Sequence, residues 1–463
     1  MPEYITYFIE LLGKDLCFYD EKTLIDYSYD HTENLKFLPS IVLKPKTVEQ
    51  ISQIVQYCNQ HKIPITPRAG GTGQMGGALP IHAGVIISIE KLNKILDIDT
   101  QNFQATVEAG VINFHLQQAL EPLGFLYGPD PSSWGSSFIG GNIATNAGGL
   151  RAVKYGVTSA SVLNLEVVLP NGDIIWTGAN TLKNSTGYNL TQLFIGSEGT
   201  LGIVTKAVLK IIPKPKTDIT ILIPFHNLED SAKAVTDIFK NGLFPCSLEL
   251  MERNALEQAM AHLEDNSIPL QENVQAHLLI SFDGESQEEL MPLIEKTISV
   301  LENYTTEEIY FADNEMDKSR LWQMRRKIAE IVKANGYTIE EDTVVPRAKL
   351  PDLINFVHQL ALKNNLKVVC YGHAGDGNLH IRFNHSQYKN SYNNPFIQAI
   401  LYDLFQYIYS LGGTISGEHG IGLIQQPYLP IVFTKANLEI QKNIKKAIDP
   451  NNIMNPGKVV NNN

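Results

Sequence analysis

Residues 67–78 read PRAGGTGQMGGA and place five glycines within eight consecutive positions. A short apolar run, IPIT at 63–66, precedes them and predicts a strand that ends where the glycines begin. Glycine tolerates positive φ angles and has no Cβ atom, so successive backbone N–H groups can converge on an anion such as a pyrophosphate. The segment lacks the G-K-[ST] ending of a Walker A loop, and it is not followed by a helix as in a Rossmann unit. By itself it fits an ordinary turn as well as a phosphate-binding loop.

The residues before this loop predict a β-α-β unit. Thr47 followed by Gln50 is a capping-box signature, and apolar residues recur from Ile51 at helical spacing. We therefore expect a helix over 47–60 between two short strands, IVL and IPITP. Further strands are predicted at 84–89, 105–110, 163–170 and 202–213. The first half of the chain is thus predicted to be mixed α+β.

Composition limits the class of protein. A chain of 463 residues with 43% hydrophobic and 19% charged residues is typical of a globular protein with two or three domains. The net charge of −12 argues against nucleic acid as a partner. The four cysteines are scattered and form no C-x-x-C pair, and the first residues carry acids where a signal peptide carries bases. We expect a cytoplasmic protein, with peripheral attachment to the inner face of the membrane left open.

A Pro/Lys-rich segment, IIPKPKTD at 211–218, separates two differently composed regions. Beyond it, strand-like runs alternate with helices predicted near 230–241, 286–303 and 313–335, which fits an antiparallel sheet flanked by helices. We therefore predict three parts, with limits at 1–217, 218–415 and 416–463.

A second constellation begins at YGHAGDGNLHIRF, residues 371–383. Its glycines predict a turn between two strands, which would fold His373 and His380 toward each other and place His380 on the same strand face as Arg382. Glu418 and His419 lie in another glycine-flanked loop, GGTISGEHGIG. Two imidazoles and a carboxylate leave a coordination position open, as in a catalytic divalent metal site, although two histidines can equally be structural. Asp376 and Asn378 are candidates for supporting such ligands.

Segments 67–78, 128–149 and 194–215 together resemble the FAD-binding domain of the vanillyl-alcohol oxidase and para-cresol methylhydroxylase superfamily, over about residues 35–216. Residues 67–78 contain neither His nor Cys, so the resemblance implies non-covalent FAD. It further implies pyrophosphate contacts by Pro67, Arg68, Gly70, Gly71, Thr72 and Gly73, flavin and ribityl contacts by Gly140, Gly141, Thr145, Asn146, Gly148 and Gly149, and adenine-side contacts by Glu198, Gly199, Gly202 and Ile203.

The segments GHAGDGNLH and SGEHGIG and the ending DPNNIMNPGKVV resemble the carboxy-terminal signatures of FAD-linked D-2-hydroxy-acid dehydrogenases. By this resemblance His373, His380 and Glu418 are ligands of a divalent metal, with zinc favoured over manganese or iron. His419 is the catalytic base. Arg325, expected at the start of a helix, binds the substrate carboxylate unless it is a solvated member of a charge run, and Asn455 returns to the flavin edge.

The resemblance implies an α+β fold with a two-part FAD-binding domain, a cap domain with an antiparallel sheet, and a C-terminal segment that packs back on the FAD domain. The implied reaction is oxidation of a D-2-hydroxy acid, D-lactate or glycolate favoured, with hydride transfer to flavin N5. Electrons would pass to a quinone, a cytochrome or an electron-transfer flavoprotein, from a homodimer or a complex of oxidase subunits. The alternatives are a D-2-hydroxyglutarate dehydrogenase, an ether-lipid synthase and a subunit that only relays electrons.

Two positions depart from the family pattern. Glu340 stands where D-2-hydroxyglutarate dehydrogenases carry a lysine, which disfavours a dicarboxylate substrate. Arg382 stands where many members have asparagine. It either holds a substrate group or pairs with Glu341 or Asp342.

Overall fold

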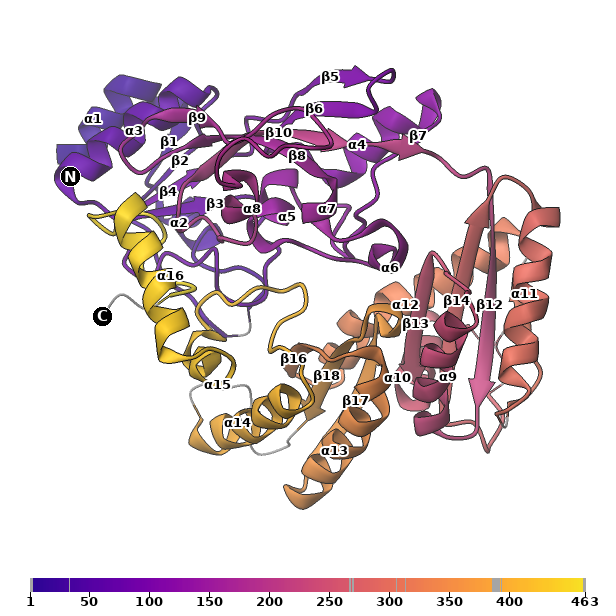
Figure 1. Cartoon of the computed structure of the whole chain (residues 1–463). Coiled ribbons are helices and arrows are strands. Elements are labelled where there is room, and N and C mark those ends of the chain that lie inside the picture. The colour runs from indigo at the N-terminus through magenta and orange to yellow at the C-terminus, as the bar shows by residue number, and fades with distance from the viewer. Residues whose placement is uncertain are drawn as a thin grey trace. The chain divides into compact units, whose positions relative to one another are not determined.

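The computed structural model describes residues 3–32, 34–265, 268, 270–304, 306–312, 314–384, 392 and 394–460. Within them the chain folds into two compact units (Figure 1). The first unit comprises Met1–Gly148, Gly156–Lys214 and Glu418–Asn463, and the second comprises Gly149–Tyr155 and Pro215–Gly417. Both units combine helices with strands, so the α+β class predicted from the sequence is confirmed.

The smaller sheet of the first unit has the strand order β1 (Cys17–Phe18), β2 (Ile41–Leu43), β4 (Val85–Ser88), β3 (Ile65–Arg68). The predicted β-α-β unit is β2, α3 (Val48–His61) and β3, with β4 inserted between its strands and parallel to both. The Thr47 hydroxyl caps α3 by accepting a hydrogen bond from the Gln50 N–H at 3.3 Å. The Gln50 side chain accepts from the Lys46 N–H instead of the Thr47 N–H, so only half of the predicted capping box forms.

The larger sheet of the first unit is antiparallel, in the order β5 (Ile95–Asp99), β6 (Gln104–Glu108), β10 (Ile203–Lys210), β8 (Val162–Val168), β9 (Ile174–Trp176). The strand predicted over 202–213 breaks at Ile211, and its end forms β11 (Ile212–Pro213), which pairs with β7 (Phe125–Leu126). One apolar cluster supports each sheet. The α-helices of this unit are α1 (Glu3–Leu12), α2 (Glu21–Asp26), α3, α4 (Asn113–Leu120), α5 (Ile139–Thr145), α7 (Thr158–Ser161), α8 (Leu190–Phe194), α15 (Leu429–Val432) and α16 (Lys435–Ile448).

The second unit is built on one antiparallel sheet of seven strands. Long apolar runs such as ITILIPF and AHLLISF form its centre, where both faces are buried. The strand order is β15 (Tyr310–Ala312), β12 (Thr217–Phe225), β14 (Ala276–Gly284), β13 (Ser247–Glu252), β17 (Lys367–Gly372), β18 (Asn378–Asn384), β16 (Ile339–Val344).

Helices cover both faces of this sheet. The face that carries Met251, Leu279 and Tyr371 packs against α10 (Arg253–Leu263) and α12 (Glu315–Ala334), and we call it the α12 face. The opposite face, which carries Leu250 and Cys370, packs against α9 (Leu228–Lys240), α11 (Gln287–Leu301) and α13 (Leu350–Lys363), and we call it the α13 face. Because side chains alternate along a strand, each strand contributes to both faces.

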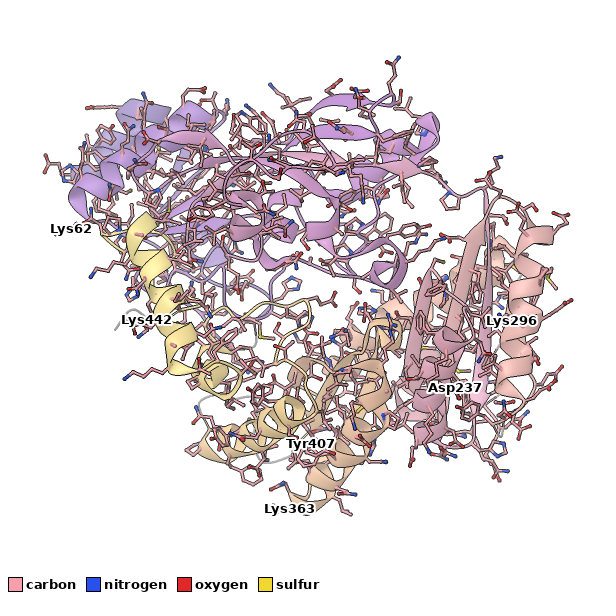
Figure 2. The ribbon with its side chains drawn as sticks, viewed as in Figure 1. Lys62, Asp237, Lys296, Lys363, Tyr407 and Lys442 are labelled. Carbon is pink, nitrogen blue, oxygen red and sulfur yellow. The ribbon has the colours of Figure 1, made fainter. Side chains whose placement is uncertain are left out.

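The three helices predicted in this region are present as α9, α11 and α12. Since α12 spans Glu315–Ala334, Arg325 lies in the middle of a long helix and not at its start. α14 (Pro395–Ser410) packs on α13, where Tyr407 stacks on Phe356 with 3.9 Å between ring centroids (Figure 2). α6 (Ala152–Tyr155) belongs to this unit as part of Gly149–Tyr155, although the chain before and after that segment belongs to the first. None of the described helices is long and apolar enough to cross a membrane.

Candidate functional site

The α12 face holds a buried glutamate beside a predicted metal ligand. β13 pairs with β17 through Leu250 opposite Gly372 and Met251 opposite Tyr371, and the same register continued places Glu249 opposite His373. The His373 Nδ1 donates a hydrogen bond to the Glu249 carboxylate at 2.8 Å. This bond assigns the proton to Nδ1, so Nε2 is the ring nitrogen whose lone pair can bind a metal.

Arg325 meets the same carboxylate from α12. Its Nε donates to the Glu249 Oε2 at 2.8 Å, and its Nη2 lies 2.6 Å from that oxygen. The Nη2 contact is close enough for an ion pair but is not aligned as a hydrogen bond, and Nη2 has no hydrogen-bond partner among the described residues. Arg325 is only 3% exposed, which excludes the alternative of a solvated charge run. A buried guanidinium with an unused donor is suited to binding an acidic ligand.

Glu249 is fully buried, and its charge is balanced on two sides. Burial alone would raise the pKa of Glu249, but His373 and Arg325 outweigh burial and hold this pKa below its usual value. The carboxylate therefore stays ionised and fixes the orientation of both partners.

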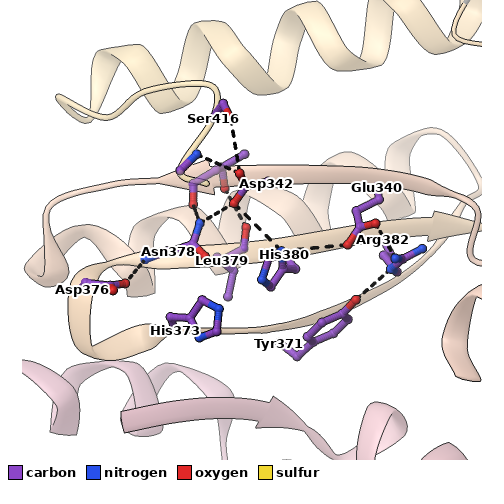
Figure 3. A network of polar contacts seen from close by, with 12 residues as sticks. Glu340, Asp342, Tyr371, His373, Asp376, Asn378, Leu379, His380, Arg382 and Ser416 are labelled. Carbon is purple, nitrogen blue, oxygen red and sulfur yellow. Dashed lines mark hydrogen bonds and ion pairs between the residues drawn. The ribbon is translucent and has the colours of Figure 1, made fainter. Parts of the chain in front are cut away.

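His380 faces His373 across the turn between β17 and β18. The two imidazole centroids are 5.4 Å apart and the rings are inclined at 80°. Both side chains are buried, and the Asp342 carboxylate lies 4.0 Å from the His380 Nδ1 (Figure 3). Two buried imidazoles with carboxylates behind them fit a divalent metal, so the donor chemistry agrees with the predicted ligands.

Asp376 and Asn378, the predicted supporting residues, lie beside the two histidines. Asn378 donates to the Asp342 carboxylate at 2.6 Å, and the Asp376 carboxylate accepts from the Asn378 N–H at 3.4 Å (Figure 3). The backbone N–H groups of both residues also donate to the His373 carbonyl oxygen at 3.2 Å, and the carboxylate partner of the His373 imidazole is Glu249.

Arg382 pairs with Glu340, and not with Glu341 or Asp342 as one alternative had it (Figure 3). The reason is the register, because β16 and β18 place Glu340 directly opposite Arg382. Its other donors reach the Tyr371 hydroxyl at 2.8 Å and the Tyr337 carbonyl at 3.1 Å. Each of its three nitrogens donates a hydrogen bond within the sheet, and Glu340 balances its charge.

In the first unit, the glycine loop closely approaches neighbouring backbone. A Cβ atom on Gly70 would lie 2.6 Å from the Ser136 carbonyl oxygen, and Gly71 has a φ of +69°. A Cβ atom on Gly73 would meet nothing within 4 Å. The buried Ser137 Oγ and Asn142 Nδ2 near this loop have no hydrogen-bond partner in the described part of the chain. A close-packed glycine loop with open space and unsatisfied polar atoms beside it fits the polar spine of FAD.

The other predicted cofactor residues lie on nearby elements of the chain. Arg68 donates to the Tyr29 carbonyl at 2.8 Å, so its side chain is engaged by the protein. Gly149 is assigned to the second unit, directly after Gly148 of the first. Pro67 and Arg68 end β3, and Thr72 lies in the glycine loop. Gly140, Gly141 and Thr145 lie on α5, and Asn146 caps α5 in the left-handed region. Gly199 follows Glu198 in a turn, Gly202 precedes β10 and Ile203 begins it.

Glu198 has a role that its predicted place beside the adenine did not suggest. Its carboxylate accepts hydrogen bonds from the Ile421 N–H at 2.7 Å and the Gly422 N–H at 2.9 Å. Burial raises the pKa of Glu198. These bonds attach the loop that carries Glu418 and His419 to the FAD-binding unit.

The C-terminal segment is attached to the same place. The Asn455 side-chain amide donates to the carbonyl oxygens of Gly77 and Glu198, both at 2.8 Å. A Cβ atom on Gly148 would lie 2.7 Å from the Glu418 Oε2, so Gly148 leaves room for this carboxylate. Glu418 and His419 belong to the first unit, whereas His373, His380 and Arg325 belong to the second.

Comparison with known proteins gives the family. The model for the C-terminal domain of FAD linked oxidases matches residues 214–459, and an FAD binding domain model matches residues 39–178. The chain belongs to the FAD-linked oxidases. This assignment confirms the FAD-binding domain and the family resemblance that the sequence motifs indicated.

Two curated relatives of this FAD-linked oxidase span almost the whole chain. The glycolate oxidase subunit GlcD of Bacillus subtilis is 39% identical over 94% of this chain and 91% of its own. The D-lactate dehydrogenase of Anaerostipes hadrus is 38% identical over 99% of this chain and 97% of its own. Among solved structures, para-cresol methylhydroxylase superposes with a TM-score of 0.80 over 98% of this chain and 95% of that one, at 21% identity, which shows a shared fold.

Sequence reasoning missed Glu249 in this FAD-linked oxidase. The signal was the charged residue in the otherwise apolar part of SLELM, because a glutamate inside a buried strand needs a partner. The partner itself was not visible, since His373 lies 124 residues further along the chain.

Proposed function

We propose that this FAD-linked oxidase converts a small D-2-hydroxy acid, with D-lactate or glycolate favoured, into the corresponding 2-oxo acid. The observation that carries the proposal is the buried Glu249 carboxylate, which fixes Arg325 and His373 side by side on the α12 face. A cation for the substrate carboxylate and an imidazole for a metal are the two groups that a 2-hydroxy acid requires. The names of the two relatives, a glycolate oxidase subunit and a D-lactate dehydrogenase, support the same substrate class.

Each residue has one task in the proposed reaction. Arg325 binds the substrate carboxylate through Nη2, while Glu249 keeps the guanidinium in place. His373, His380 and Glu418 hold the metal, and His419 accepts the hydroxyl proton as the carbonyl forms. When bound, FAD accepts the hydride that leaves the substrate Cα, and a divalent metal, with zinc favoured over manganese or iron, polarises the hydroxyl. The products are the 2-oxo acid, reduced FAD and a proton on His419.

FAD is proposed to bind without a covalent link, because residues 67–78 contain no His or Cys. The electron acceptor in this proposal would be a quinone, a cytochrome or an electron-transfer flavoprotein. Peripheral membrane attachment and assembly as a homodimer or with other oxidase subunits belong to the same proposal.

A dicarboxylate substrate such as D-2-hydroxyglutarate is disfavoured. The Arg382 side chain is engaged by Glu340, Tyr371 and Tyr337, so it does not provide a second cation for a distal carboxylate. A subunit that only relays electrons would not require a buried arginine with an unused donor beside a metal-binding imidazole.

Anaerobic reduction of the bound flavin by paired D- and L-2-hydroxy acids tests the proposal without knowledge of the electron acceptor. D-Lactate or glycolate should bleach the flavin fastest, and L-lactate and D-2-hydroxyglutarate should be much slower. A flavin that none of these acids reduces would overturn the assignment. The His419→Asn variant should keep FAD and metal while flavin reduction slows by ~10²-fold or more. Glu418→Ala should instead lose metal, as measured by elemental analysis.

A further inference from the structure

A second set of side chains with potential metal ligands lies on the α13 face, where β13 and β17 supply two of its residues and α13 the third. The β13–β17 register places Glu252 opposite Cys370. The Cys370 N–H donates a hydrogen bond to the Glu252 Oε2 at 2.6 Å, which holds the carboxylate beside Cys370. Both residues are buried.

His358 reaches this pair from α13. Its Nε2 lies 2.5 Å from the Glu252 Oε1. One ligand atom each from Glu252, His358 and Cys370 lies within 4.8 Å of the other two. Three residues from two strands and a helix are thus held together, and small shifts would bring all three ligand atoms to one ion.

Two members of the set, Glu252 and His358, line a cavity, and the Cys370 backbone N–H donates a hydrogen bond to Glu252. The cavity has a volume of about 460 Å³ and is lined by Glu252 and His358 together with polar residues such as Asp230 and Asn355. His358 has a side chain 44% exposed, whereas that of Glu252 is 8% exposed. An ion can therefore enter from solvent past His358, and the cavity has room for water or a small ligand at a fourth coordination position.

We propose that Glu252, His358 and Cys370 bind a borderline transition-metal cation, of which Zn²⁺ is the representative case. A thiolate, an imidazole and a carboxylate with one open position match the ligands and coordination number of zinc. Sulfur and nitrogen ligands are poorly suited to Mg²⁺ and Ca²⁺, which prefer oxygen.

Binding exchanges protons for the cation. Burial and the neighbouring Glu252 raise the pKa of Cys370, so the sulfur is a thiol before the cation arrives. Coordination releases the thiol proton, and it releases the proton that His358 shares with Glu252. The ion then replaces the direct contact between His358 and Glu252.

X-ray absorption at the zinc edge tests this proposal because the ligands proposed for the other metal include no sulfur. The full-length FAD-loaded protein is stripped with a chelator, given excess Zn²⁺ and desalted. The wild-type protein should show a sulfur ligand at about 2.3 Å from zinc. Cys370→Ser should lose this ligand, whereas His373→Asn should keep it. Absence of a zinc–sulfur distance in the wild-type protein would overturn the proposal.

Cys246→Ser is the matched control, since Cys246 is a second buried cysteine of the same unit and its thiol donates to the Ser281 carbonyl. This variant should retain the zinc–sulfur distance. If Cys370→Ser does not fold, His358→Gln provides the test, because His358 is partly exposed on a helix. Its affinity for Zn²⁺ should fall by about tenfold or more, as expected for loss of a ligand. Unchanged affinity in His358→Gln, or a sulfur ligand that persists in Cys370→Ser, would also refute the site.

Discussion

The two faces of the seven-stranded sheet each hold a buried glutamate beside a histidine, but the two histidines are exposed to solvent to different degrees. On the α12 face, Glu249 has two buried partners, Arg325 and His373, which are 3% and 5% exposed. On the α13 face, the histidine partner of Glu252 is His358, whose side chain is 44% exposed beside a cavity. The first arrangement fixes its groups for one reaction geometry, whereas the second can exchange a proton or an ion with solvent.

The difference follows from the elements that supply the residues. Glu249 lies within β13 and faces His373, the residue that follows the end of β17, and Arg325 of α12 covers the pair. Glu252 is the last residue of β13, and α13 presents His358 at the edge of a cavity. Both buried carboxylates need a partner, but the partners of Glu249 are themselves buried whereas the histidine partner of Glu252 reaches solvent.

The largest predicted effect tests whether the α12 face depends on buried charge balance. Arg325→Met leaves Glu249 buried with one partner fewer, so the free energy of unfolding should fall by about 3–5 kcal/mol. Urea denaturation of the FAD-loaded protein measures this. Arg320→Met on the same helix is the control, since Arg320 is 34% exposed and pairs with Asp317 and Asp265. Its loss should cost about 1 kcal/mol or less. Equal losses of unfolding free energy in the two variants would show that the buried pair of Arg325 and Glu249 stabilises the protein no more than an exposed pair does.

The motifs with local spacing were predictable from the sequence. The glycine loop at 67–78 and the strand-turn-strand around His373 and His380 are each contained in about a dozen residues, so turn chemistry and alternation define them. The helix that carries Arg325 was also predicted, although not the position of Arg325 within it. The amphipathic pattern identifies a helix better than it locates the ends.

The relations between distant strands were not predictable. The pairing of Arg382 with Glu340 depends on the register of β16 against β18, and a shift of one residue would have offered Glu341 instead. The assignment of Gly149–Tyr155 to the second unit likewise has no local signal. Its Lys154 and Tyr155 both contact Asp283, more than a hundred residues away along the chain.

A second prediction compares the two glutamates directly. Glu249→Gln keeps an oxygen for His373 but removes the charge that orients this ring and Arg325, so metal affinity or turnover should fall by about 10–100-fold. Glu252→Gln makes the same chemical change on the α13 face, away from the proposed reaction, and turnover should change by less than about twofold. Anaerobic flavin reduction distinguishes the two variants. A loss of turnover in Glu252→Gln as large as that in Glu249→Gln would mean that the faces are not functionally separate.

The smallest effect concerns another histidine, His277 of β14, which lies opposite Met251 and therefore on the α12 face. It is 1% exposed and its Nδ1 has no hydrogen-bond partner among the described residues, in contrast to His373 and His358 with their carboxylates. Burial, together with the charge of Arg253, lowers the pKa of His277 from 6.5 to about 4. Between these values the unfolded chain binds a proton that the folded chain does not. The stability associated with neutral His277 is therefore complete above the unfolded pKa and is lost as pH falls toward the folded pKa.

The His277→Leu variant removes this proton linkage. Relative to the variant, the wild-type protein should lose up to about 1.4 kcal/mol of unfolding free energy for each pH unit below the ordinary histidine pKa. Urea denaturation of both proteins at neutral pH and at two mildly acidic values gives the difference. At mildly acidic pH this loss should be smaller than the loss of unfolding free energy caused by Arg325→Met. Only one imidazole is protonated, and it is neutral at neutral pH. A constant difference between the two proteins across this range would mean that a partner stabilises protonated His277, and the α12 face would then contain a second charge-balanced histidine like His373.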